Sequence, residues 1–295
     1  MTETEKITIG LVVAPGVTER LGESLIQELP DVLSEQYNNK KEWTIDLVTD
    51  PLTGFAESVD EIFKKVADYH DKRKWDYVIS ITDLPMFAEH QVMALDINMY
   101  NGAAIFSYPA FGWRPVKKRF KQAIVSIIQE LHEAENVDRN YDDNNNIETS
   151  VSRQFPLSKI SKTKVYLEET DSYHLRYLSD SRSRGMFRLV SGMTFANNPL
   201  NMMASLSNIV AIAFTTGAFG LVFTTMWQMA NSFSMWRLFG ISIIAIIGML
   251  IWIMMSHNLW ESIKESNNKR ITWLYNATTV MTLVIAIIIY YIIPV

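Results

Sequence analysis

The sequence predicts an α/β cytosolic domain, with a mainly parallel sheet and a β-hairpin, followed by an α-helical membrane domain of three transmembrane helices. Residues 6–135 alternate strand-like and helix-like patterns, as βαβ units do. The last third is almost uncharged: residues 201–295 carry only Arg237, Lys264, Lys269 and Arg270 against Glu261 and Glu265. Soluble domains are about a quarter charged. The C-terminal third is therefore expected to lie in a membrane.

Three strands at 6–14, 43–49 and 75–82 are expected to form the parallel part of the sheet. Helices are expected at 18–29, ending at Pro30, and at 58–72. Segments 91–97 and 103–108 flank Asn101-Gly102, a dipeptide that favours the turn of an antiparallel hairpin. A helix with basic residues in its first turns follows at 115–133. These elements define a Rossmann-like domain over 1–135.

Residues 136–180 are predicted to be an acidic linker with a possible hairpin at 162–179. The linker is expected because its charged stretch cannot bury enough apolar surface to fold. Residues 181–198 are predicted to form an amphipathic juxtamembrane helix. Its basic positions, Arg182, Arg184 and Arg188, are candidates for contact with anionic lipid. An ordinary helix packed on the cytosolic domain is the alternative.

Residues 199–295 are predicted to form the three-helix membrane domain, with spans at about 200–229, 238–256 and 271–293. None of these contains a charged side chain, and each reaches the ~20 residues that cross a bilayer. Basic residues precede the first span and lie between the second and third, which predicts a cytoplasmic N-terminal domain and an outside C-terminus. The N-terminal MTETEKITIG lacks the features of a signal peptide. We expect a multi-pass protein of the cell membrane.

Small residues recur on one stripe of the first span. They are Ala213, Thr216, Gly217, Gly220 and Thr224. Such stripes let helices pack closely, so we expect packing within the chain or in a homo-oligomer. A pore lined by the threonines of this span is the alternative.

Polar and turn-forming residues follow the strands of the predicted sheet. The candidate ligand crevice comprises Pro15, Gly16, Thr18, Thr49, Asp50, Thr82, Asp83 and Ser107. Open α/β sheets bind ligands beyond the carboxyl ends of their strands, and two carboxylates could hold Mg²⁺ or act as acid and base. Alternatively, these residues end strands and bond to nearby backbone groups.

Motifs for specific chemistry are missing from the sequence. It has no GxxxxGK[ST] loop, no GxGxxG after the first strand and no cysteine, and its five histidines show no ligand spacing. We therefore identify no catalytic residue, metal site or cofactor. Residues 1–200 hold 23 basic and 30 acidic side chains, which argues against nucleic acid as a partner.

Several stretches resemble a known family. They are ITDLP at 81–85, FSYPAFG at 106–112, VKKRFKQAI at 116–124, RGMFRLVSGMTFANNP at 184–199, and SNIVAIAFTTGAFGLVFTTMW with SMWRL in the membrane part. Over roughly 75–125 and 180–240 the chain resembles an uncharacterised family of Gram-positive bacterial membrane proteins. Thr215 stands where that family's span pattern opens with glycine. Some members carry the label methylene-tetrahydrofolate dehydrogenase, which implies a folate-like metabolite.

Three functions remain open at this point. The first is a membrane-anchored, self-associating protein whose cytosolic domain binds a small-molecule ligand or a partner as a non-catalytic scaffold or sensor. The second is a membrane-tethered enzyme acting on a nucleotide-like or folate-like metabolite. The third is a channel or transporter component gated by the cytosolic domain. The lack of catalytic motifs favours the first.

Overall fold

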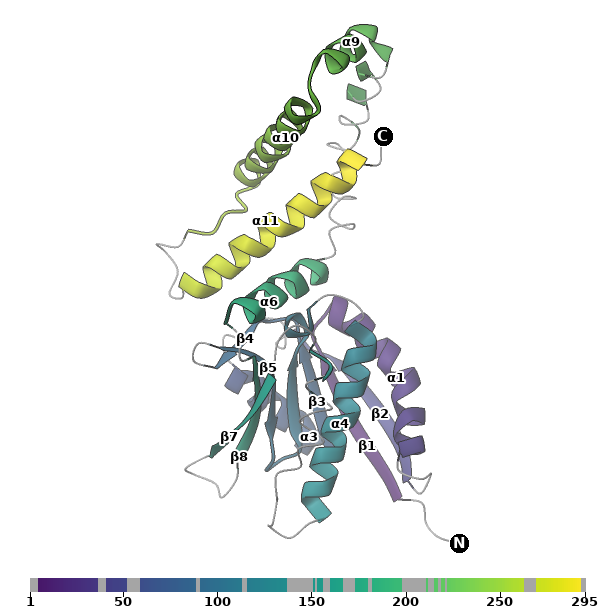
Figure 1. Ribbon diagram of the computed structural model, residues 1–295. Helices are drawn as coiled ribbons and strands as arrows, with labels where there is room; N and C mark the ends of the chain where they lie inside the picture. Colours follow the sequence, from purple (N-terminus) through teal and green to yellow (C-terminus); the bar gives the residue numbers. More distant parts are fainter. Residues whose placement is uncertain are drawn as a thin grey trace. The chain divides into compact units, whose positions relative to one another are not determined.

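The computed structural model divides the chain into two compact units, Met1–Met193 and Thr194–Val295 (Figure 1). The structure describes residues 5–36, 41–51, 59–88, 91–112, 116–136, 151, 153–155, 160–166, 173–179 and 182–197, and then 211, 215–216, 219–220, 222–262 and 269–292. The first unit is an α/β domain and the second is helical.

One mixed sheet of eight strands organises the described part of the α/β unit, in the order β2-β1-β3-β6-β5-β8-β7 with β4 on β5. The strands β1 (Glu5–Val13), β2 (Lys41–Thr49), β3 (Tyr77–Thr82) and β6 (Ala103–Ser107) pair in parallel. The strands β4 (Met86–Ala88), β5 (Gln91–Asn98), β7 (Ile160–Tyr166) and β8 (Tyr173–Ser179) add through antiparallel pairs. The predicted α/β fold and the hairpin at Asn101-Gly102 are confirmed.

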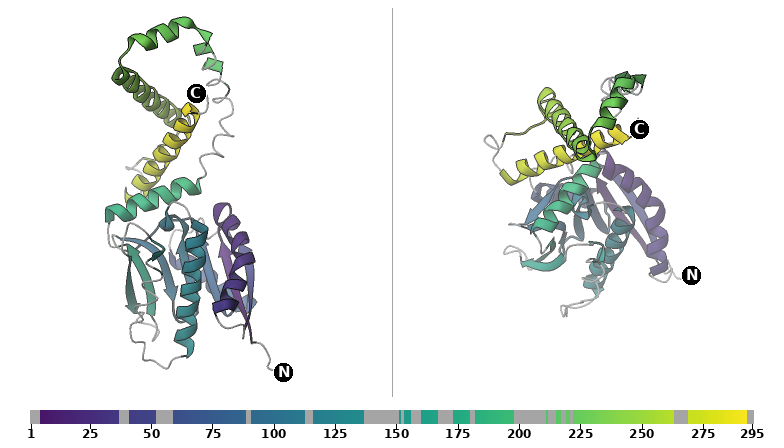
Figure 2. Two further views of the ribbon diagram at one scale, coloured as in Figure 1. Left: turned by 45° about the vertical axis from the view of Figure 1, so that its right-hand side comes forward. Right: turned by 45° about the horizontal axis from the view of Figure 1, so that its top comes forward.

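Helices cover both faces of the sheet. Helices α1 (Val17–Gln36) and α4 (Val116–Asn136) lie side by side on one face, and α3 (Val59–Arg73) lies on the other (Figure 2). Alternate residues of the strands point to opposite faces. Val12, Val78 and Ile105 accordingly pack with Ile62 and Val66 of α3.

Helix α1 does not end at Pro30, so that prediction was wrong: the helix continues to Gln36 with the proline inside it. An interior proline costs about 3 kcal/mol because it removes a hydrogen bond and crowds the preceding turn. Leu29 and Leu33 flank Pro30 and are 1% and 0% exposed. Burying a leucine contributes about 1.5–3 kcal/mol, so packing on the sheet offsets the cost of the proline.

The 160–179 hairpin belongs to the sheet instead of forming a linker region of its own. Strand β8 pairs with β5 as well as with β7. Glu130 of α4 is fully buried and accepts hydrogen bonds from Lys162 and from Tyr177 Oη, the latter at 2.8 Å. Asp96 of β5 lies 2.9 Å from His174 Nδ1 and accepts a 3.0 Å hydrogen bond from Arg176 Nε. These buried polar contacts attach the hairpin to the rest of the unit.

Helix α6 (Arg182–Ala196) packs against the 3₁₀ turn η1 (Tyr108–Phe111) that follows β6. A Cβ added at Gly192 would lie 2.1 Å from the Pro109 carbonyl oxygen, so only glycine allows this approach. The guanidinium of Arg188 lies over the Phe155 ring at 5.4 Å. The helix is thus packed on the α/β unit, as the alternative interpretation had it.

The lipid-contact candidates on α6 differ in their surroundings. Arg184 is exposed, Arg188 is half-buried, and Arg182 begins the helix with its side chain outside the described atoms. Contact of these three arginines with lipid stays a prediction.

The second unit contains two helices long and apolar enough to cross a membrane among the described residues: α10 (Met235–Ser256) and α11 (Lys269–Ile292). They coincide with the second and third predicted spans. They pack through Ile253 and Met254 of α10 against Leu283 and Ile287 of α11. Most of the first predicted span, 200–229, lies outside the described residues, and the short helix α9 (Thr224–Ser232) covers its end.

Of the small residues predicted to mediate helix packing, Ala213 and Gly217 lie outside the described residues. Thr216 and Thr224 are exposed, and a Cβ added at Gly220 would meet no atom within 4 Å. Packing between copies of the chain therefore stays a prediction.

Candidate functional site

The candidate crevice residues lie at one edge of the sheet. The strands that precede them, β2, β1, β3 and β6, are neighbours and run parallel, so their carboxyl ends meet there. This proximity was predicted from the sequence. The hydrogen bonds of the individual side chains decide what the edge can do.

Asp50 is buried, and its polar groups make hydrogen bonds within the protein. The residue is 6% exposed, and its backbone N–H donates to the Val13 carbonyl oxygen at 2.9 Å. Tyr69 Oη donates to its Oδ2 at 2.8 Å, and Lys65 Nζ lies 3.8 Å from the same oxygen. The hydrogen bond to Asp50 raises the pKa of Tyr69. Asp50 therefore connects β1 and β2 to α3.

The residues after β1 also bond locally. Glu19 of α1 accepts from Thr49 Oγ1 at 3.0 Å and from the Gly16 N–H at 3.3 Å. Gly16 has φ +94°, a left-handed conformation that favours glycine, and both it and Pro15 are exposed. Thr18 is fully buried and donates to the Ala14 carbonyl oxygen. These contacts begin helix α1 at the end of β1.

Thr82 and Ser107 are opposite each other in the β3–β6 pair and share one partner, Leu84. The Leu84 N–H donates to Thr82 Oγ1 at 3.0 Å, and Ser107 Oγ donates to the Leu84 carbonyl oxygen at 2.8 Å. Both hydroxyls therefore hold the 83–85 turn in place.

Asp83 differs from the other strand-end residues. Its Oδ1 is buried and has no hydrogen-bond partner among the described residues, and burial raises the pKa of this carboxyl. The described residues also contain no group of three or more His, Asp or Glu side chains that could hold a metal ion. In the described structure the edge is thus a network of structural hydrogen bonds in which one carboxyl oxygen, Asp83 Oδ1, has no partner.

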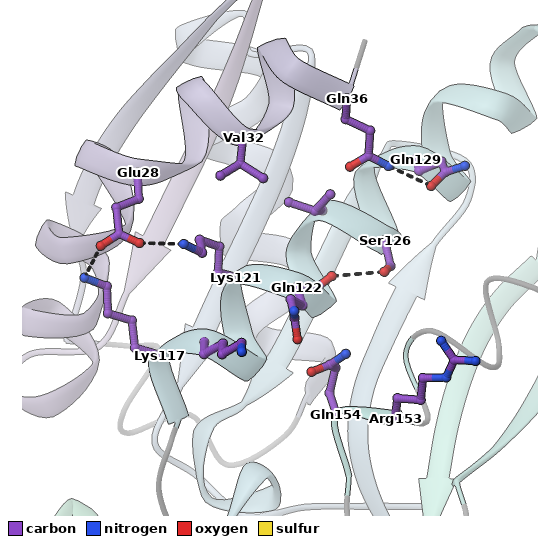
Figure 3. Close-up of a pocket in the computed structure, with 12 residues that line it drawn as sticks. Glu28, Val32, Gln36, Lys117, Lys121, Gln122, Ser126, Gln129, Arg153 and Gln154 are labelled. Atoms are coloured by element: carbon purple, nitrogen blue, oxygen red, sulfur yellow. Dashed lines mark hydrogen bonds and ion pairs between the residues drawn. The ribbon is translucent and has the colours of Figure 1, made fainter.

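A second polar region lies on the outer surface of the α/β unit, in a groove of about 900 Å³ between α1, α4 and the 153–154 segment. We call it the α1/α4 groove. Figure 3 shows its walls: Glu28, Val32 and Gln36 from α1 on one side, and residues of α4 with Arg153 and Gln154 on the other. A 3.0 Å hydrogen bond from Gln36 Nε2 to Gln129 Oε1 joins the two helices. The groove opens to solvent.

The groove is basic. Among the described residues, four cationic side chains line it, Lys117, Lys118, Lys121 and Arg153, and Glu28 supplies the single carboxylate. Both oxygens of Glu28 are engaged, by Lys117 Nζ at 2.5 Å and Lys121 Nζ at 2.7 Å. These two hydrogen bonds hold the pKa of Glu28 down at about 2, so the carboxyl is ionised throughout the physiological range.

Sequence reasoning did not identify this groove. The basic start of α4 was visible as VKKRFK, but Glu28 lies about 90 residues earlier and Arg153 some 30 residues later. Only the packing of α1 beside α4 brings the three segments together.

Comparison of the chain with known protein families, with curated proteins and with solved structures found no match.

Proposed function

We propose that the chain is a membrane-anchored, self-associating protein whose cytosolic α/β domain binds a ligand or partner without catalysing a reaction. The exposed apolar surface of α10 carries this proposal. The helix has 22 residues, and Ile244 and Trp252 are 71% and 73% exposed. Such a surface is unfavourable in water, whereas lipid solvates it.

The polar groups of the α/β unit support binding over catalysis. At the strand ends, Asp50, Thr82 and Ser107 make hydrogen bonds within the protein. A general acid or base must reach the substrate's proton, and these groups already hold the fold together. The α1/α4 groove, by contrast, has charged side chains open to solvent.

The glycines of the membrane unit support self-association. A Cβ added at Gly220, Gly240 or Gly248 would meet no atom within 4 Å in the described part of the chain. Open glycines allow helix backbones to approach closely in a bilayer. A second copy is the partner we propose for them.

The topology can be tested by labelling single introduced cysteines, because the chain has none of its own. We propose three spans with the N-terminal domain inside. Ser234→Cys and Val295→Cys should then react with a membrane-impermeant maleimide in intact cells, and Asn267→Cys should react only after lysis. Protection of Val295→Cys would instead indicate two spans, and extraction of the protein by alkaline carbonate would refute the anchor.

Self-association can be tested by cross-linking. Cross-linking of the reconstituted chain would measure its copy number, and a monomer at all concentrations would contradict self-association.

A further inference from the structure

We propose that the α1/α4 groove binds a phosphate-bearing anion. Lys118 and Arg153 contact the anion first. The anion then replaces Glu28 as the partner of Lys117 and Lys121. This inference rests on the proposed function, that the α/β unit binds a ligand, and names the site and the chemical class of that ligand.

The charge of the groove is opposite in sign to that of its surroundings. Residues 1–200 have 23 basic and 30 acidic side chains, an excess of seven negative charges. The described residues that line the groove carry four cations and one carboxylate, an excess of three positive charges. A local field opposite in sign to the domain's net charge concentrates anions there and repels them elsewhere on the surface.

Two of the cations in the groove are available to a ligand. Lys118 and Arg153 are exposed, and neither has an ion pair or hydrogen bond within the described residues. The planar guanidinium of arginine binds two phosphate oxygens at once, and lysine binds phosphate as a compact point charge. The amide group of Gln122 is exposed in the same groove and can donate further hydrogen bonds.

Glu28 pairs with the other two cations of the groove. Its carboxylate lies between Lys117 and Lys121, where it stands in for an external anion. All three side chains are partly exposed, at 40%, 44% and 27% respectively. Exposed ion pairs contribute little to stability, so exchanging one carboxylate for a more highly charged phosphate has a small structural cost.

The size of the groove indicates more than one phosphate. The cations come from α4 and from Arg153, and the groove measures about 900 Å³, within the range of sites for whole metabolites. An oligophosphate compound and the headgroup of an anionic lipid share this chemistry.

The test uses the full chain in neutral detergent, titrated with sodium tripolyphosphate by isothermal calorimetry at about 0.1 M salt, where the Debye length is about 10 Å. Lys118→Gln/Arg153→Gln should weaken binding about tenfold or more, because two charge-assisted contacts are lost. Glu28→Gln should strengthen it several-fold, because Lys117 and Lys121 lose their internal competitor. The matched control is Lys64→Gln/Lys72→Gln, which removes the same charge from α3 on the opposite face of the sheet. Its affinity should stay within about twofold of wild type, since exposed charges beyond a Debye length are screened.

Micellar phosphatidylglycerol and phosphatidylcholine identify the source of the phosphate. Competition by phosphatidylglycerol alone assigns the site to a lipid headgroup, and no competition assigns it to a soluble phosphate compound. Absence of tripolyphosphate binding in both the wild type and Glu28→Gln overturns the proposal, as does equal weakening by the α3 control. A chain that fails to bind yet remains inserted and oligomeric refutes this site alone. A chain that binds but is extracted by carbonate refutes the membrane anchor and leaves the site.

Discussion

The strand-end edge and the α1/α4 groove are both polar, yet they use their polar groups in opposite ways. At the edge, side chains such as Asp50 and Ser107 are buried and bonded to neighbouring elements. In the groove, Lys118 and Arg153 are exposed and the one ion-paired carboxylate, Glu28, faces solvent. Position at the carboxyl ends of parallel strands therefore does not by itself leave polar groups available to a ligand. What matters is whether polar groups still have unused hydrogen-bonding capacity.

The largest effect on the free energy of unfolding is expected where α6 packs against the turn η1 that follows β6. Gly192→Ala would place a Cβ 2.1 Å from the Pro109 carbonyl oxygen. The overpacking should lower the free energy of unfolding of the α/β unit by about 3 kcal/mol. This change can be measured as a shift in the urea midpoint of the full chain in neutral detergent, with pulse proteolysis as the readout of unfolding. Ser183→Ala, at an exposed position of the same helix, is the control and should stay near wild type. A stable Gly192→Ala variant would show that α6 is not closely packed there.

A smaller loss is expected from Asp50→Ala at the same edge. The change removes the acceptor of the Tyr69 hydroxyl and the neighbour of Lys65. Hydrogen bonds to charged groups contribute about 1.5–3 kcal/mol, so the same urea assay should show a loss of about 2 kcal/mol.

Asp50→Asn provides the control, because its amide oxygen can still accept from Tyr69 and should recover part of the loss. If Asp50→Ala instead kept full stability and abolished binding of a metabolite, the edge would be a ligand site. The contrast drawn between the strand-end edge and the α1/α4 groove would then be wrong.

The sequence was sufficient to predict the parallel strands, the Asn101-Gly102 hairpin and the two apolar helices, because each depends on a local pattern. Clustering of the strand-end residues also followed, since parallel neighbours end at one edge. Three features depended on tertiary contacts and could not be predicted. They are the continuation of α1 through Pro30, the attachment of the β7–β8 hairpin through Glu130 and Asp96, and the groove. In each case residues distant in sequence supply the stabilising contact or the charge.

The smallest effect is expected at Asp83, the one strand-end carboxyl with a buried oxygen that lacks a partner in the described structure. Burial raises its pKa in the folded protein above that of the unfolded chain. The folded state therefore binds this proton more tightly, and that stabilisation is complete below the unfolded pKa and is lost as pH rises through the folded pKa. Above the folded pKa the ionised carboxylate is destabilising.

Asp83→Asn cannot ionise, so it should stabilise the α/β unit at pH 7 by up to about 1 kcal/mol, a small value because solvent screens a carboxyl that is only partly buried. The gain should shrink as the pH falls through the folded pKa and wild-type Asp83 takes up its proton. Urea midpoints at pH 4, 5.5 and 7 measure this convergence, with Asp68→Asn at a half-exposed position of α3 as the control. A gain equal at all three pH values would mean that Asp83 does not titrate in this range. A loss of stability at pH 7 would mean that the Asp83 carboxylate makes stabilising hydrogen bonds within the protein, as the other strand-end side chains do.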